Sequence, residues 1–371
     1  MDSMTPDERL DAVMHCHPTA RVPTAPKIEE YAGKIAGITN AEFIWDSEKG
    51  LSALDTCHDV LGGWDFYRAV YIKIFGPLQK AIGITRSKLP GLELAPDMPY
   101  QALEEEVMRP EDYDLLIGEG LVAYNAEFWR RAHGVDDSRI TTALAEQAEL
   151  ERHCNERARS KVMVPLYGGF VPFALDFLWL ARSLREFSKD LFRRPDQVEK
   201  ALTVATEGSI QLALKAVAES GVPRVFMGFT RGSATFMSPK MFRRFCMPFL
   251  KRMVDALSPH GIMLFLHADG DWTMHMEAFR ELPRHSVVLE LDGTSDIFGA
   301  KRILGDHLCL LGDVNATLLT LGTPERVQAY CRRLIDEVGT GGGFILGSGC
   351  TVPLTAKREN VEAMLRSVHS R

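Results

Sequence analysis

The chain has 371 residues, of which 46% are hydrophobic and 25% are charged, and its formal net charge is −7 at pH 7. This composition is typical of a globular protein, and without a long block of lysines and arginines a nucleic-acid-binding surface is not expected. No uninterrupted run of about 18 apolar residues occurs, so we expect no membrane-spanning helix.

The cysteines and the N-terminus bear on the cellular compartment. The seven cysteines include no C-x-x-C pair and no framework spacing, which favours reduced thiols. The first ten residues lack the charged-then-apolar layout of a signal peptide. We therefore expect a cytoplasmic protein.

Residues 1–150 carry weaker patterns than the rest of the chain. Three stretches have helical patterns, and Leu89–Tyr100 is rich in turn-forming residues. The three stretches are Asp7–His15, Phe66–Phe75 and Met108–His133. The pattern predicts an irregular, mainly helical N-terminal part.

From about residue 160, short apolar runs alternate with longer amphipathic stretches. The runs predicted as strands are Val162–Leu166, Val225–Gly228, Ile262–Leu266, Ser286–Leu291, Leu308–Leu311 and Gly343–Leu346. The stretches predicted as helices are Phe173–Leu191, Pro195–Glu219, Pro239–Leu257, Asp271–Leu282 and Pro324–Val338. Such alternation predicts a parallel sheet, either a closed barrel or an open doubly wound sheet.

The glycines favour the barrel. A nucleotide-binding open sheet carries a glycine fingerprint after its first strand, whereas here Gly341–Gly343 precedes a strand. We interpret this run as a tight turn that uses positive φ angles. The prediction is therefore a single α/β domain over residues 1–371, a (β/α)₈ TIM barrel whose N-terminal elaboration occupies about residues 1–150.

Polar side chains follow four of the predicted strands where each strand ends. They are His267, Asp269, Glu290, Asp292, Asp313, Asn315 and Cys350. In a (β/α)₈ barrel the active site is built at the carboxyl ends of the strands. We therefore expect these side chains to meet at one mouth of the barrel.

Part of this set has the chemistry of a metal site. His267 and Asp269 are two positions apart at a strand end and so point to the same side, and closure of the barrel brings Cys350 alongside. Glu290 or Asp292 would complete the shell. Nitrogen, thiolate and carboxylate ligands together suit Zn²⁺. Taken one at a time, the same residues fit a strand-capping histidine, a turn aspartate and a buried core cysteine.

Several motifs in this order resemble the uroporphyrinogen decarboxylase superfamily, and within it the corrinoid-linked methyltransferase branch. The resemblance covers about residues 160–365. It rests on Tyr167–Phe173, Ser238–Phe249, His267–Gly270, Leu311–Asn315 and Gly349–Pro353. It implies a (β/α)₈ barrel, in agreement with the strand pattern.

Two differences from the family refine the expected activity. The decarboxylases carry an Arg-Gln-Ala-Gly-Arg type motif near the N-terminus, and this chain has only Arg21-Val22-Pro23, which disfavours decarboxylation. The methyltransferase branch binds zinc through His-x-Cys and a distant Cys. Asp269 stands where the branch has the first of these cysteines. A carboxylate makes the zinc harder and more Lewis acidic, which suits an oxygen leaving group.

The resemblance therefore implies the demethylating component of an O-demethylase. A small methylated substrate, such as an aromatic methyl ether, would give its methyl group to the Co(I) corrinoid (cobalamin) of a carrier protein. Asp313, Asn315 and Tyr167 are the expected catalytic or substrate-orienting residues. Arg231 is the candidate contact to the corrinoid or to an anionic substrate. Homodimer formation stays open.

Three alternatives are kept. The enzyme could instead transfer a methyl group from a corrinoid protein to a thiol, as in coenzyme M methylation. The zinc site could use Cys309 together with Cys350. Finally, the chain could be a corrinoid carrier without its own activity, although no Asp-x-His-x-x-Gly motif is present.

Overall fold

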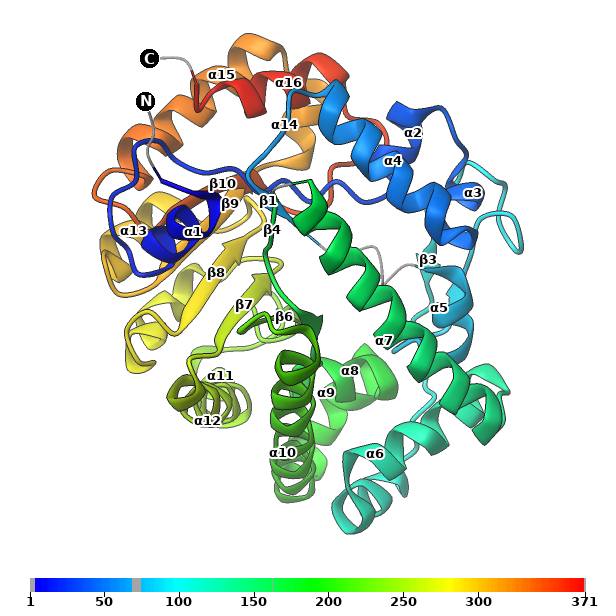
Figure 1. Ribbon diagram of the computed structural model, residues 1–371. Helices are drawn as coiled ribbons and strands as arrows, with labels where there is room; N and C mark the ends of the chain where they lie inside the picture. The colour runs from blue at the N-terminus through cyan, green and yellow to red at the C-terminus, as the bar shows by residue number, and fades with distance from the viewer. Residues whose placement is uncertain (1–3, 69–74, 162, 370–371) are drawn as a thin grey trace.

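The computed structural model describes residues 4–68, 75–161 and 163–369. Strands occupy the centre and helices surround them (Figure 1). The main sheet is parallel and has the order β10-β9-β8-β7-β6-β5. Its strands are β5 (Gly169–Phe170), β6 (Arg224–Gly228), β7 (Met263–Ala268), β8 (Val287–Leu291), β9 (Cys309–Val314) and β10 (Phe344–Ser348).

Five of the predicted strands coincide with β6 to β10. Every residue of β7, β8, β9 and β10 is buried. This burial explains why these strands read as continuous apolar runs, since parallel strands are covered on both faces. The run at 162–166 contains β4 (Val164–Pro165), although Val162 lies outside the described residues.

The N-terminal part closes the sheet into a ring. Thr24 bridges Leu346 on β10 in a parallel register, and its carbonyl accepts from the backbone N–H groups of Asp65 and Phe66. Strand β1 (Phe66–Tyr67) then pairs with β4 in parallel. Residues 23–27 therefore form the strand position between β10 and β1, and the predicted (β/α)₈ barrel is confirmed.

Asp65 fastens this closure. Its carboxylate lies 2.6 Å from Arg21 and 2.9 Å from Arg9, and it accepts the Thr24 N–H at 2.8 Å. The helical pattern predicted for Phe66–Phe75 is wrong at its start, because β1 begins there. Strand β1 has only two residues and is defined by its hydrogen bonds to the neighbouring strands, so it is too short to leave a pattern in the sequence. Residues 69–74 of that stretch lie outside the described residues.

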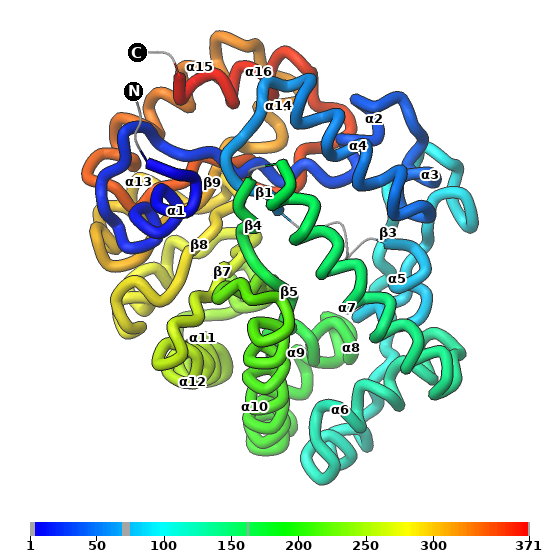
Figure 2. The backbone as a smooth tube through the Cα atoms, in the orientation of Figure 1, coloured from blue at the N-terminus to red at the C-terminus, as the bar shows by residue number. Residues whose placement is uncertain are grey.

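Helices surround the barrel, and the colours show the chain passing round it from α4 to α16 (Figure 2). The order is not strictly that of the chain, because α6 packs against α10 more extensively than α7 does. In the first half they are α1 (Pro6–Met14), α2 (Tyr31–Ala36), α3 (Asn40–Trp45), α4 (Ser47–Val60), α5 (Gly76–Ile82), α6 (Asp112–His133) and α7 (Asp137–Ser160). In the second half they are α8 (Ala174–Arg182), α9 (Leu184–Arg193), α10 (Pro195–Ser220), α11 (Pro239–Phe245), α12 (Met247–Leu257), α13 (Ile297–Leu304), α14 (Ala316–Leu321), α15 (Pro324–Arg333) and α16 (Arg358–Arg366). Among the described residues, no helix is both long and apolar enough to cross a bilayer.

Four of the predicted helices are interrupted or differ in type. The stretch 173–191 breaks at Ser183, which has a φ of +70°, and the stretch 239–257 breaks at Cys246. Residues 273–281 form a 3₁₀ rather than an α-helix, and the stretch 324–338 ends in a π-helical turn. Gly341, Gly342 and Gly343 all have positive φ, which confirms the tight turn before β10.

The barrel interior is filled with apolar side chains and closed at one end by α1. Leu10, Val13 and Met14 of α1 belong to the same buried cluster as Phe226 and Phe265 of the strands. The opposite end, where the strands terminate, is the end at which the polar residues gather.

Candidate metal centre

Strand β7 and the residue two positions after β10 bring three donor atoms together. His267, Asp269 and Cys350 each offer one ligand atom, and these atoms lie within 4.8 Å of one another. His267 Nε2 is 3.1 Å from Asp269 Oδ1 and 3.4 Å from Cys350 Sγ. The predicted same-side pair and the residue 83 positions away therefore do meet.

The register of the sheet places Glu290 on the other side of the imidazole. Glu290 of β8 stands directly opposite His267 of β7, and its Oε2 is 2.9 Å from Nδ1 of that histidine. The carboxylate is also held at 2.7 Å through both oxygens by Arg68. Glu290 is thus not among the clustered donors. It occupies the position from which a carboxylate orients a metal-binding histidine.

Charge controls the protonation of this set. Burial and the neighbouring Lys27 disfavour an imidazolium, but the carboxylates of Glu290 and Asp269 raise the pKa of His267 well above its ordinary value. Burial opposes ionisation of Glu290, and the Arg68 and His267 charges outweigh it, so that its pKa is lowered. Arg68, Glu290, His267 and Asp269 therefore follow one another at ion-pair distances.

The Lys27 ammonium lies beside the ligand atom of His267. Its Nζ lies 3.5 Å from His267 Nε2 and 3.8 Å from Glu29 Oε1, and its side chain is 6% exposed. Burial opposes the charge, but Glu29 and Cys350 raise the pKa of Lys27 above its ordinary range. The backbone is fixed by the Lys27 N–H, which donates to Ser348 Oγ at 2.9 Å.

Asp269 is positioned by its own loop. Its Oδ2 accepts the Thr230 hydroxyl at 3.3 Å, and its carbonyl accepts the Trp272 indole N–H at 3.0 Å. Asp292, the other predicted carboxylate of this region, accepts the backbone N–H groups of Gly270 and Thr294. Asp292 therefore shapes the loop that carries Asp269 and is not one of the clustered donors.

The predicted substrate-orienting residues have local partners. Asp313 accepts the Tyr330 hydroxyl at 2.7 Å, and burial raises its pKa to about 6. Asn315 caps α14 by accepting the Thr317 N–H at 2.8 Å. Asp313 is the last residue but one of β9 and Asn315 follows that strand, so both lie at its carboxyl end, but neither belongs to the three clustered donors.

Tyr167 and Arg231, the other two predicted site residues, also have local partners. Tyr167 is buried inside the barrel against Phe226, with ring centroids 5.0 Å apart, and burial raises its pKa to about 12. Arg231 is 3.7 Å from Glu104 and stacks over Phe236 at 4.9 Å. Tyr167 therefore contributes to the barrel interior, and Arg231 already has an acidic and an aromatic partner.

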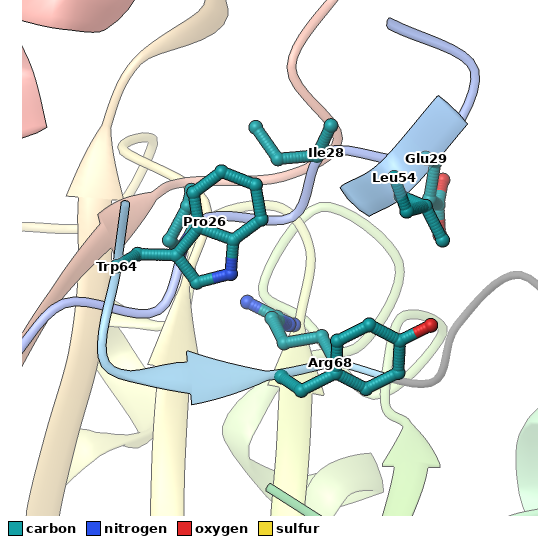
Figure 3. Close-up of a pocket in the computed structure, with 7 residues that line it drawn as sticks. Pro26, Ile28, Glu29, Leu54, Trp64 and Arg68 are labelled. Atoms are coloured by element: carbon teal, nitrogen blue, oxygen red, sulfur yellow. The ribbon is translucent and has the colours of Figure 1, made fainter. Parts of the chain in front are cut away.

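A pocket adjoins the Arg68 side of the site. Figure 3 shows Pro26, Ile28 and Glu29 from the first strand segment beside Trp64 and Arg68 from the β1 region. Its lining is completed by Leu54 and Tyr67. The same two N-terminal segments thus close the barrel, line this pocket and supply Lys27 and Arg68 to the site.

A sequence model of the family described as uroporphyrinogen decarboxylase (URO-D) matches residues 141–371, more than half of the chain. The chain belongs to the URO-D family. Uroporphyrinogen decarboxylase from Cellvibrio japonicus (strain Ueda107) is 26% identical over 195 residues, which is 51% of this chain and 52% of that protein. The enzyme of the same description from Dechloromonas aromatica (strain RCB) is 29% identical over 195 residues, 50% and 52% of the two chains.

The chain spans about half the length of these curated relatives. Over its whole length it is similar in fold to a solved structure, a methyltransferase from Methanosarcina mazei. That match has a TM-score of 0.72 at 20% identity and covers 99% of each chain. The likeness extends to the N-terminal part, where the family model does not reach.

The donor set of this URO-D family member fits zinc. Imidazole nitrogen, thiolate sulfur and carboxylate oxygen are all zinc ligands, and three protein ligands leave a position for substrate. Cys309 does not belong to this set, because it begins β9 and packs in the interior cluster with Ile345 and Phe265. Among the described residues, Cys309 is therefore not one of the clustered donors that include Cys350.

Two residues of the site were not predicted from the sequence. Lys27 and Arg68 reach His267 and Glu290 across 240 and 222 residues, so no local pattern points to them.

Proposed function

We propose that this protein is a zinc-dependent methyltransferase that removes the methyl group from an O-methyl substrate, such as an aromatic methyl ether. The corrinoid of a partner protein would accept that group. The observation that carries the proposal is the convergence of His267, Asp269 and Cys350 at the barrel mouth. The fold of the methyltransferase from Methanosarcina mazei supports it.

The residues have separate tasks in this proposal. His267, Asp269 and Cys350 would hold the ion, which would act as a Lewis acid toward the oxygen of the ether. Glu290, which lies 2.9 Å from Nδ1 of His267, would keep Nε2 of that imidazole directed at the ion. Arg68 holds Glu290 through two short contacts, so a turn of the imidazole would break its contact with a carboxylate that is fixed in place.

The carboxylate of Asp269 favours an oxygen substrate over a thiol. A set with two thiolates is softer and more electron rich, and it activates a thiol as its thiolate. One thiolate and one carboxylate leave more positive charge at the ion, which stabilises negative charge on oxygen. Methyl transfer to a thiol is the second candidate, and it is disfavoured by this ligand.

Metal content tests the proposal first. Protein purified without chelator should hold about one zinc per chain, measured by atomic emission. His267→Ala and Cys350→Ala should lose it, whereas Cys309→Ala, which removes a buried thiol away from the donors, should keep it. Retention in both ligand variants, or loss in the Cys309 variant, would refute the site.

A substrate panel then separates the two reactions. Zinc-loaded protein is incubated with free Co(I) cobalamin and either methoxyarenes or methylated thiols, and the methylated corrinoid is followed by its absorbance. Turnover of methoxyarenes alone supports O-demethylation. Turnover of thioethers alone would replace it with thiol-directed transfer.

A further inference from the structure

The Lys27 ammonium is buried at the candidate metal centre, and its polar contacts with the described residues are long. It carries three N–H donors, yet it lies 3.5 Å from His267 Nε2 and 3.8 Å from Glu29 Oε1, and 5.8 Å from the centre of the Phe226 ring. Both polar distances exceed the usual range for a charge-assisted hydrogen bond. Glu29 is itself engaged by the Thr351 hydroxyl. A buried charge in this state is costly unless a further acceptor reaches it.

The position of Lys27 is built rather than incidental. It is the last residue of the strand position formed by residues 23–27, and active-site residues of a barrel stand at such strand ends. Its N–H donates to Ser348 Oγ, and its carbonyl accepts the Val352 N–H at 2.8 Å. Ser348 ends β10, and Val352 follows Cys350 by two residues. Lys27 is therefore clamped to the same loop that carries the thiol ligand.

The ordinary alternative is that Lys27 is a counter-ion for Cys350 and Asp269. That role ends once a divalent cation neutralises the two anions, since the cation would then stand beside another positive charge. A second cation is useful there only if negative charge arrives during binding or reaction. Ether cleavage supplies such a charge, because the electron pair of the broken C–O bond stays on oxygen while the methyl group leaves for the corrinoid.

We propose that Lys27 is an oxyanion-stabilising residue that hydrogen-bonds the oxygen released from the methyl group, sharing its negative charge with the metal. This inference rests on the proposed function, and it specifies the product as an anion such as a phenolate. Lys27 keeps its proton as it binds the anion, so no further reactant is needed.

Two readouts of opposite sign test it. Zinc affinity is measured by competition with a chromophoric chelator, and phenolate binding is measured with 4-nitrophenol, whose anion absorbs in the visible. Lys27→Met should bind zinc more tightly, because a neighbouring positive charge is removed. The same variant should raise the pKa of bound 4-nitrophenol by about one unit, which corresponds to roughly tenfold weaker binding of the phenolate.

The controls separate this role from a structural one. Lys27→Arg should restore most of the phenolate preference. Lys34→Met is the matched control, because the Lys34 ammonium of α2 donates to the Leu354 carbonyl and not to the candidate metal centre. It should change neither the zinc affinity nor the pKa of bound 4-nitrophenol. Weaker zinc and weaker phenolate binding together in Lys27→Met would mean structural damage and overturn the proposal, as would no change in either. Wild-type protein that binds no zinc would refute the proposed function itself, whatever Lys27 does.

Discussion

Replacement of Arg68 by methionine should be among the most damaging single changes to the site. The guanidinium and the Glu290 carboxylate face each other at 2.7 Å through two contacts, with side chains 2% and 1% exposed. Removing one partner of a buried ion pair costs about 3–5 kcal/mol, because the other charge remains buried and unpaired. The unfolding entropy is near 2.1 cal/mol/K per residue, roughly 0.8 kcal/mol/K for this chain, so the melting temperature should fall by about 4–6 °C.

The double variant is the sharper test. Arg68→Met combined with Glu290→Gln removes both charges and should recover most of the lost stability. Differential scanning calorimetry of the wild type, both single variants and the double variant gives the coupling directly. Zinc affinity measured on the same four proteins should fall by about 10- to 100-fold wherever the His267–Glu290 contact is weakened. A double variant that melts below Arg68→Met would refute the reasoning.

Three further changes have definite expected outcomes. Asp176 is buried, and burial raises its pKa to about 7. Because the folded state then binds the proton more tightly than the unfolded state, the free energy of unfolding of the wild type should fall as the pH rises from about 4 to about 7. Asp176→Asn should therefore add up to about 4 kcal/mol in urea unfolding at pH 8 and little at pH 4, and an equal gain at both would contradict the cause. Asp269→Cys should keep zinc but move turnover from methoxyarenes toward thiols, and unchanged selectivity would deny the ligand its role. Ser183→Gly should raise the melting temperature by about 1 °C. The φ of +70° is strained for serine, whereas replacing a serine N-cap by glycine costs only a few tenths of a kcal/mol. A lower melting temperature than that of the wild type would show that the lost cap outweighs the relieved strain.

The second half of the barrel was predictable because its strands are buried on both faces. Continuous apolar runs that end in polar residues identify β7 and β9, and the same pattern located His267 and Asp313. The interruption at Cys246 had a signal as well, since Pro248 stands in the first turn of α12, where proline is favoured. Nothing comparable marks Ser183.

The N-terminal strands could not be predicted in the same way. Residues 23–27 contain Pro23 and Pro26, which argue against a strand when read locally. Their strand position depends on hydrogen bonds to β10, more than 300 residues away. Glu290 was expected among the ligands because the sequence shows that it lies near the end of a strand. The sequence does not show which residue of the neighbouring strand it stands opposite. Only the pairing of β7 with β8 places it on the Nδ1 side of His267.

The arrangement of charges connects closure of the barrel with the chemistry of the site. Arg68 and Lys27 come from the two segments that complete the ring, and each approaches His267 or its partner Glu290. A barrel that opened between β10 and β1 would therefore lose both cations at once and leave the Glu290 and Asp269 carboxylates on the two sides of His267. Their mutual repulsion would penalise that opening, whereas a bound divalent cation would relieve it. Through Arg68 and Lys27, closure of the barrel and the charge at the candidate metal centre are therefore coupled.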